Sequence, residues 1–313
     1  MFILVKILLL YLVYSTGLSF TRYVLRIPLF RKDLLLMDNI EKQCIISAKN
    51  NKMYCDKDAK LFMDENELIS DKKLITISPG GFKGFYILGI LTYIKENYNT
   101  DDLIYSGASA GSWNGLFMCY KGDPLEFVYK LLDNNIMKAK SITELEYFVK
   151  YKLLTSYKDE DFDLTKLFVG VTTLKNFELI INIFSEFQSL EDAINCCIAS
   201  SHIPLITGSL TNKYNDMYTF DGGFGNYPYL NKSRLLHVSP SMWNDMKPQN
   251  KILKGINTLK KFSEFFSVSK NNLLELFDDG YSDAKKHKDY LDKIFIVKNE
   301  YQKENNSSSN AII

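Results

Sequence analysis

Residues 103–119, LIYSGASAGSWNGLFMC, decide how this chain folds. The run LIYSG predicts a short buried strand, and the apolar stretch that begins at Ser112 predicts a helix. Between them, residues 107–111 read Gly-Ala-Ser-Ala-Gly, a G-x-S-x-G motif. A strand that enters such a turn and a helix that leaves it have the order of a nucleophile elbow.

The turn has a simple physical requirement. It must be so tight that Gly107 and Gly111, two residues on either side of Ser109, carry no bulk. The Ser109 hydroxyl then projects above the sheet, next to the positive potential of the helix N-terminus. Small residues are common, so the pentapeptide alone is equally compatible with an ordinary turn and a capping serine. The flanking strand and helix favour a nucleophile.

The same strand–turn–helix pattern occurs upstream of this motif. LITIS at 74–78 leads into Pro79, Gly80 and Gly81, and residues 85–97 have a helical pattern. FVGVTTL (168–174) and LIINIF (179–184) are further strand candidates, residues 123–163 read as charged helix, and 190–200 predict a buried helix. Strands that alternate with helices predict an α/β fold with a mostly parallel sheet covered on both faces.

Composition excludes several classes of protein. The 313 residues carry a net charge of +1, so the global basic footprint of a nucleic-acid binder is missing. With three histidines and no CxxC among five cysteines, neither a zinc ribbon nor a thioredoxin-like motif is available. Cys119, Cys196 and Cys197 lie in apolar runs and should be buried, while Cys44 and Cys55 would pair only in an oxidising compartment.

The first twenty residues, MFILVKILLLYLVYSTGLSF, form a hydrophobic segment of their own. It has the pattern of a secretory signal peptide, but it would also serve as a retained membrane anchor. We therefore expect membrane association through this segment or, alternatively, secretion after its cleavage. The expected organisation is this segment (1–20), an extension (21–71), one α/β domain (72–295) and a polar disordered tail (296–313).

Two more turns carry candidate chemistry. The loop from Gly80 to Gly84 lacks the lysine and hydroxyl pattern of a phosphate-binding loop, which disfavours a nucleotide-binding protein. Its backbone N–H groups would suit the oxyanion of an acyl-transfer intermediate, although its glycines would also serve simple helix packing. Asp221-Gly222-Gly223 is most often just a turn, yet a carboxylate at the same sheet edge would deprotonate Ser109.

These three elements, in this order, resemble the patatin-like phospholipase family. The resemblance runs from about Lys73 to Tyr290. Further stretches resemble its animal branch of triglyceride lipases and adiponutrin-like proteins: Gly84-Phe85-Tyr86 with Gly89, Ile203-Pro204 with Gly208, Val238-Ser239-Pro240, and Gly280 with Asp283-Ala284.

The resemblance implies a three-layer α/β/α sandwich and a Ser–Asp dyad that hydrolyses lipid acyl esters, of phospholipid or acylglycerol, through an acyl-enzyme. It implies no metal or organic cofactor, no nucleic-acid partner, and action at a membrane or lipid-droplet surface. By carry-over, Ser109 is the nucleophile, Asp221 the base, and the amides of Gly80, Gly81 and Phe82 the oxyanion hole. The remaining motif positions are Lys83, Gly84, Gly107, Gly111, Gly222 and Gly223.

One position departs from this pattern. Pro79 stands where the family has its first glycine, and proline has no N–H to offer an oxyanion. The oxyanion hole must then rely on later amides. This departure motivates the alternative function, a catalytically weak or silent lipid-binding protein that keeps the fold.

A histidine-based triad is the rival mechanism. The order Ser109, Asp221, His237 would suit an α/β-hydrolase, but His237 lies in a strand-like run. We expect His237 and His202 to be structural. The following residues, which would suit an apolar pocket, we expect in the core: Phe82, Phe85, Trp113, Phe117, Ile203 and Leu205.

Overall fold

The computed structural model describes residues 53–55, 67–133, 136, 139, 141–175, 178–204, 206–209, 211–225, 227–243 and 272–298. The N-terminal segment 1–20, most of the extension 21–71, Cys44 and the tail beyond 298 lie outside these ranges. Within the described part, no helix combines the length and apolar character that a bilayer span requires. Residues 296–298 pack on the domain, since the Asn99 N–H donates to the Ile296 carbonyl.

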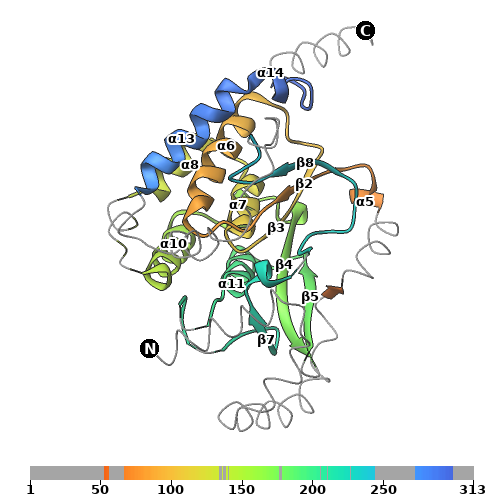
Figure 1. The fold of residues 1–313 in the computed structure, drawn as a ribbon, viewed down its shortest axis with the longest axis vertical. Coiled ribbons are helices and arrows are strands. Elements are labelled where there is room, and N and C mark those ends of the chain that lie inside the picture. The colour runs from red at the N-terminus through yellow and green to blue at the C-terminus, as the bar shows by residue number, and fades with distance from the viewer. Residues whose placement is uncertain are drawn as a thin grey trace, which may run out of the picture.

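An eight-stranded sheet forms the centre of the domain (Figure 1). Its strands are β1 (Met53–Cys55), β2 (Lys73–Ile77), β3 (Leu103–Ala108), β4 (Leu167–Lys175), β5 (Glu178–Phe184), β6 (Asn212–Tyr214), β7 (Met217–Phe220) and β8 (Arg234–Val238). The main order is β1-β5-β4-β3-β2-β8, with β7 paired to β4 and β6.

The middle of the sheet is parallel. Strand β3 pairs in parallel with β2 and β4, and β2 pairs in parallel with β8. Strand β5 is antiparallel to β4, because a short hairpin joins them where a parallel pair would need a crossover helix. The expected α/β class and its mostly parallel centre are confirmed, with antiparallel strands at one side.

The structure has helices where the sequence predicted them, at 85–97, from Ser112, within 123–163 and at 190–200. The helices are α5 (Glu67–Ser70), α6 (Gly84–Asn97), α7 (Ala110–Cys119), α8 (Pro124–Leu131), α10 (Ile142–Ser156), α11 (Leu190–Ser200), α13 (Leu273–Lys286) and α14 (Lys288–Leu291). Three of them, α5, α13 and α14, were not predicted. The charged stretch 123–163 divides into α8 and α10, whose first turns are capped by the Asp123 and Ser141 side chains. Short 3₁₀ turns occur at Gly81–Lys83, Asp159–Asp161, Leu164–Lys166 and Gly222–Phe224.

Alternating side chains divide the core between the two faces of the sheet. Ile75 and Ile77 of β2 point into the large core shared with α6, α7 and α11. Leu74, which precedes Ile75 and points to the opposite face, joins a smaller cluster there that includes Ile69 of α5 and Leu230. The layered α/β/α arrangement is therefore confirmed, with one thick helical layer and, among the described residues, one thin layer.

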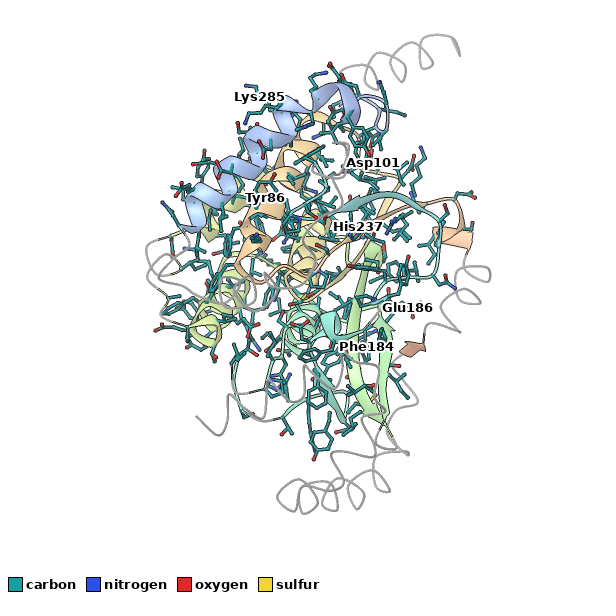
Figure 2. The ribbon with its side chains drawn as sticks, viewed as in Figure 1. Tyr86, Asp101, Phe184, Glu186, His237 and Lys285 are labelled. Atoms are coloured by element: carbon teal, nitrogen blue, oxygen red, sulfur yellow. The ribbon has the colours of Figure 1, made fainter. Side chains whose placement is uncertain are left out.

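Helices α6 and α13 cross at two glycines. A Cβ on Gly280 would lie 1.9 Å from the Tyr86 carbonyl oxygen, and one on Gly89 would lie 2.1 Å from the Phe277 carbonyl oxygen. The Tyr86 hydroxyl, on α6 beside α13 (Figure 2), donates a 2.7 Å hydrogen bond to Asp283. Burial alone would raise the pKa of Asp283, but hydrogen bonds from Tyr86 and Lys286 outweigh it and lower that pKa.

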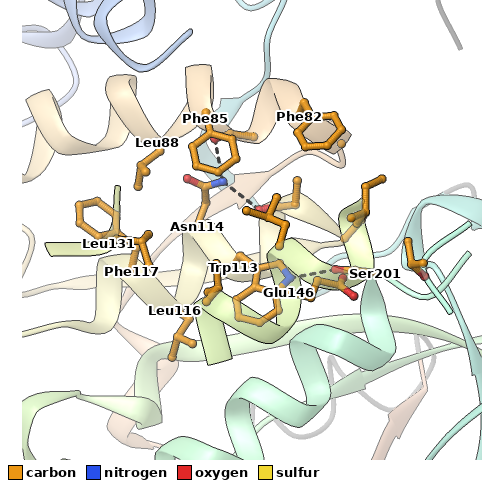
Figure 3. A pocket seen from close by; sticks show the side chains of 18 of the residues that line it. Phe82, Phe85, Leu88, Trp113, Asn114, Leu116, Phe117, Leu131, Glu146 and Ser201 are labelled. Carbon is orange, nitrogen blue, oxygen red and sulfur yellow. Dashed lines mark hydrogen bonds between the residues drawn. The ribbon is translucent and has the colours of Figure 1, made fainter. Parts of the chain in front are cut away.

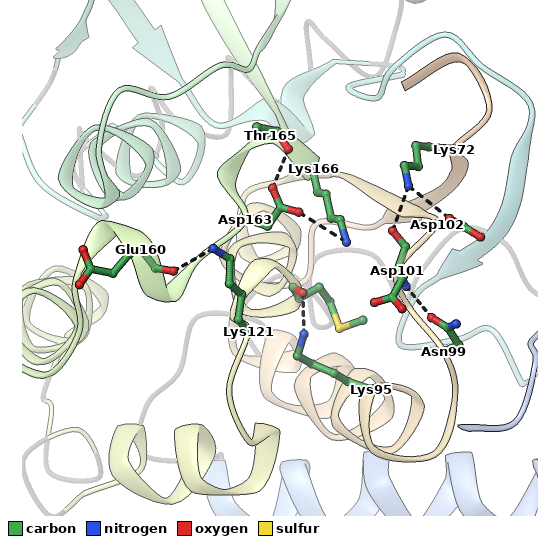
Figure 4. A network of polar contacts seen from close by, with 11 residues as sticks. Lys72, Lys95, Asn99, Asp101, Asp102, Lys121, Glu160, Asp163, Thr165 and Lys166 are labelled. Carbon is green, nitrogen blue, oxygen red and sulfur yellow. Dashed lines mark hydrogen bonds and ion pairs between the residues drawn. The ribbon is translucent and has the colours of Figure 1, made fainter. Parts of the chain in front are cut away.

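A polar network lies at the edge of the sheet where β3 and β4 begin (Figure 4). There Lys95 is buried, and its ammonium donates a 2.8 Å hydrogen bond to the Met118 carbonyl in the last turn of α7. Burial lowers the pKa of Lys95 to about 8. Because Ser109 follows the other end of β3, this network lies at the edge of the sheet away from the turn at Ser109.

We predict that Gly280→Ala destabilises the domain, because the added methyl collides with backbone and the two helices must move apart. Overpacking of this kind costs about 1–3 kcal/mol, which thermal unfolding should report as a Tm lower by several degrees. Ser282→Ala, at an exposed position on the same helix, is the matched control and should leave the Tm unchanged. A Gly280→Ala protein as stable as wild type would contradict the close crossing.

Candidate catalytic site

The turn at Ser109 is held by backbone contacts that only glycine permits. A Cβ on Gly107 would lie 2.2 Å from the Gly111 carbonyl oxygen, and one on Gly111 would lie 2.2 Å from that of Ile77. Ser109 itself has φ 53° and ψ −129°, a positive φ that is uncommon for a residue with a side chain. Such a conformation costs about 1–3 kcal/mol and persists only where its surroundings enforce it.

Ser200, at the end of α11, locks this turn from the side. The Ser109 N–H donates to the Ser200 hydroxyl at 2.8 Å, and that hydroxyl donates to the Gly170 carbonyl of β4 at 2.7 Å. Ser200 is completely buried. Sequence reasoning missed it, because a serine at the end of an apolar helix carries no motif.

Asp221 lies beside Ser109. It directly follows β7, which brings the aspartate to β4 through the pairing of Phe220 with Thr172. The Asp221 carboxylate accepts a 2.7 Å hydrogen bond from the Gly223 N–H, and the Ser109 hydroxyl is near enough to lower the pKa of the acid. Both side chains are buried, with 7% and 5% of Ser109 and Asp221 exposed.

The Asp-Gly-Gly turn also depends on close approach. A Cβ on Gly222 would lie 2.2 Å from the Gly170 carbonyl oxygen and 2.8 Å from the Ala108 methyl group. The Asp221 N–H donates to the His202 carbonyl at 2.7 Å, and the Thr172 hydroxyl donates to the Asp221 carbonyl at 2.9 Å. Both the N–H and the carbonyl of Asp221 are therefore hydrogen-bonded, which fixes its backbone with the carboxylate beside Ser109.

Burial dominates the electrostatics of this pair. It raises the pKa of Asp221 from 3.8 to about 6, although the hydrogen bonds from Ser109 and Gly223 oppose the rise. A carboxylate with a pKa near 6 is ionised at neutral pH and is more basic than an ordinary aspartate. It is suited to accept a proton from a neighbouring hydroxyl.

The glycine loop after β2 faces the same place. Gly81 has φ 50°, which favours glycine, and begins a 3₁₀ turn. No described residue accepts a hydrogen bond from the N–H groups of Gly81 or Phe82. Both residues line one cavity together with Ser109 and Ala110, whereas Gly80 is buried outside that lining.

Three neighbours of this loop have distinct places. Ala110, the first residue of α7, has an N–H without an acceptor inside the helix and adds a candidate oxyanion donor that sequence reasoning missed. Gly84 lies so close to α7 that a Cβ would be 2.8 Å from the Ala110 methyl group. Lys83 is exposed. Pro79 packs next to the other turn, since a Cβ on Gly223 would lie 3.1 Å from its ring.

An apolar cavity of about 130 Å³ opens at Ser109 (Figure 3). This volume is close to that of an engineered cavity that admits benzene. Phe82, Phe85, Trp113, Phe117 and Ile203 line it, so these residues belong to a pocket wall as well as to the core expected for them. The sixth of that set, Leu205, lies outside the described residues.

Glu146 is the unexpected member of the wall. It comes from α10, is 9% exposed, and lies beside Ser201 and Trp113 (Figure 3). Sequence reasoning gave it no role, because it sits in a helix of ordinary charged appearance. Its burial shows only once α10 is packed against the cavity.

The two candidate histidines, His237 and His202, contact other groups. His237 Nδ1 is 2.9 Å from the Thr76 hydroxyl, and the ring packs edge-on against Tyr229. His202 is 4% exposed and meets Asp221 through its backbone carbonyl. Among the described residues, no cluster of three or more His, Cys, Asp or Glu side chains would hold a metal ion.

Comparison with known proteins gives a consistent result. Residues 75–230 match the family model described as patatin-like phospholipase. The chain is 25% identical to human patatin-like phospholipase domain-containing protein 4 over 241 residues, which cover 68% of this chain and 94% of that protein. It is 27% identical to mouse 1-acylglycerol-3-phosphate O-acyltransferase Pnpla3 over 175 residues, 51% of this chain and 41% of that protein.

We predict that Asp221→Asn stabilises the protein above pH 7. The folded-state pKa of about 6 lies above the unfolded value of 3.8, so ionising the buried acid costs folding free energy as pH rises through this window. Asparagine avoids that cost, which is about 3 kcal/mol at most. Urea unfolding at pH 8 and pH 4 should show the gain at pH 8 and its near disappearance at pH 4.

Asp278→Asn, at an exposed position of α13, serves as the control and should show no such gain. An Asp221→Asn protein whose stability relative to wild type is the same at both pH values would contradict the raised pKa.

Proposed function

Since residues 75–230 form a patatin-like phospholipase domain, we propose that this protein is a serine acyl ester hydrolase that cleaves lipid esters. One observation carries the proposal. The Ser109 hydroxyl, on a strained turn at the mouth of an apolar cavity, lies beside the buried carboxylate of Asp221, whose pKa it lowers.

In the proposed reaction, Ser109 Oγ attacks the ester carbonyl carbon while its proton passes to Asp221. The carbonyl oxygen becomes an oxyanion and accepts hydrogen bonds from the free N–H groups of Gly81 and Phe82, with Ala110 as a further donor. The carbon–oxygen bond to the alcohol then breaks, and Asp221 returns the proton to the leaving alkoxide. An acyl-enzyme on Ser109 remains.

Hydrolysis of the acyl-enzyme repeats the same steps with water. Asp221 takes a proton from the water, whose oxygen attacks the acyl carbon, and the proton then restores the Ser109 hydroxyl. No histidine is needed, because the Asp221 carboxylate beside Ser109 itself acts as the base. With Pro79 lacking an N–H, the amides of Gly81, Phe82 and Ala110 carry the oxyanion.

The cavity supports an acyl substrate. Its wall is mainly aromatic and aliphatic, so the burial of methylene groups there is worth about 0.8 kcal/mol each. The proposed substrates are phospholipids or acylglycerols met at a membrane or lipid-droplet surface. The part of the chain expected to hold the protein there, residues 1–20, lies outside the described residues.

We predict that a fluorophosphonate probe labels Ser109 and that Ser109→Ala loses both labelling and ester hydrolysis by at least 10³-fold. Gel fluorescence and a lipid-class hydrolysis panel would measure the two losses. Ser282→Ala, an exposed serine, should be labelled like wild type. A wild-type protein that resists labelling in the presence of lipid would support the silent lipid-binding alternative.

We also predict that the labelling rate depends on the ionisation of Asp221. The rate should be half-maximal near pH 6 and should fall about tenfold per pH unit below it. His202→Ala and His237→Ala should retain this profile. A loss in either histidine variant as large as that in Ser109→Ala, with the fold intact by circular dichroism, would favour the histidine triad.

A further inference from the structure

We propose that Glu146 is a specificity-determining residue, which accepts a hydrogen bond from a neutral hydroxyl group of the substrate in the cavity next to Ser109. This inference rests on the hydrolase function proposed above. It concerns which ester the cavity favours.

The first observation is an acceptor without a donor. Glu146 lines the cavity, and its Oε1 is buried without a hydrogen-bond partner. A buried polar atom in this condition destabilises the empty cavity, and a ligand that supplies the missing donor removes the penalty. Oε1 is covered in the empty cavity, so a ligand meets it after rotation about the last side-chain torsion, which is soft.

The hydrogen bonds of Ser201 indicate which hydrogen-bonding role is left for the Glu146 carboxyl group. The Ser201 hydroxyl donates to the Cys197 carbonyl at 2.9 Å and accepts from Trp113 Nε1 at 3.0 Å. Its single proton is thus used, and its remaining lone pair can only accept. A protonated Glu146 beside Ser201 would therefore donate its proton to that lone pair, which leaves the other carboxyl oxygen as an acceptor.

The surroundings agree with a protonated acid. Burial, together with the nearby negative charge of Asp221, raises the pKa of Glu146 well above its ordinary value. A neutral acid in an apolar wall is compatible with acyl chains, whereas a carboxylate there would lose its hydration when an acyl chain covered it, at a cost in free energy.

A second wall residue points to the same ligand chemistry. Asn114 donates through Nδ2 to the carbonyls of Gly84 and Ala110, which fixes its amide with Oδ1 as the acceptor. That Oδ1 is also buried without a partner, and Asn114 lines the cavity. Figure 3 shows Asn114 and Glu146 in the wall, with the dashed bonds of Asn114 and of Trp113 to Ser201. Two orphan acceptors call for a donor on the ligand.

The donor should be neutral. Among the described residues that line the cavity there is no lysine, arginine or histidine, so a phosphate group would find no cation from them. A hydroxyl group supplies the donor without a charge to desolvate. It can come from the alcohol side of the ester, as in a glycerol monoester, or from a hydroxylated acyl chain.

The test compares two matched pairs of substrates. One pair is a glycerol monoester and the same ester with both free hydroxyls methylated, and the other is a methyl ester with and without a hydroxyl on its acyl chain. We expect wild type to favour the hydroxyl-bearing member of one pair by about tenfold in kcat/KM, and the pair that shows it identifies the source of the hydroxyl.

Two variants of Glu146 distinguish the need for an oxygen acceptor from the need for a carboxyl group. Glu146→Gln keeps a donor for Ser201 and an acceptor for the ligand, so it should retain the preference. Glu146→Met has a similar shape and no oxygen acceptor, so its preference for the hydroxyl-bearing ester should fall to about onefold. Glu144→Gln, two residues away on α10 and outside the cavity lining, is the control and should match wild type.

Equal rates for both members of both pairs in wild type, as expected if only water occupies this place, would overturn the proposal. So would a preference that survives in Glu146→Met. If neither wild type nor any variant hydrolyses any ester, the proposed function fails. Whether Glu146 favours a hydroxyl-bearing ligand can then still be measured by binding. Titration of Ser109→Ala, followed by the fluorescence of Trp113, should show tighter binding of the hydroxyl-bearing ester, and the Ser109→Ala/Glu146→Met double variant should lose that difference.

Discussion

The turn at Ser109 is the constraint on which the rest of the site depends. Its strained backbone is stable only because the chain approaches itself at Gly107 and Gly111 more closely than any Cβ would permit. The hydrogen bond from the Ser109 N–H to Ser200 ties the turn to α11, and Ser200 ties it on to β4. Each link joins segments that are distant in the chain. The tertiary contacts of the domain thus fix the orientation of the Ser109 hydroxyl group.

Two buried carboxyl groups then have different tasks because their partners differ. The Gly223 N–H, which donates to Asp221, and the nearby Ser109 hydroxyl favour the ionised form of Asp221 and hold its pKa to about 6 despite burial. Glu146 is surrounded by an apolar wall and lies near the charge of Asp221, so its proton is retained. In the proposed mechanism, the same side-chain chemistry would therefore supply a base at the serine and a neutral hydrogen-bonding group in the cavity.

Much of the fold follows from local pattern. The strands at β2, β3 and β4 and the helix from Leu190 to Ser200 were predictable, because each is bounded by turn residues and has the apolar content of a buried element. The antiparallel turn between β4 and β5 is also explained by the short segment that joins them. The close crossing of α6 and α13 was less predictable. Glycines at 89 and 280 stand in helical patterns, where nothing in the sequence shows that each faces the backbone of the other helix.

The sequence alone determined the α/β class and the motifs that bring Ser109 and the glycine loop to one edge of the sheet, since the parallel strands β2 and β3 end at a common edge. Asp221 reaches the same place from β7, which is antiparallel to β4. Only the tertiary structure decided which amides face the serine, that Ser200 holds its turn, and that Glu146 is buried in the cavity wall. The physical reason is that burial and hydrogen-bond partners come from segments tens of residues away. A residue such as Glu146 has no local pattern that distinguishes it from a solvated glutamate.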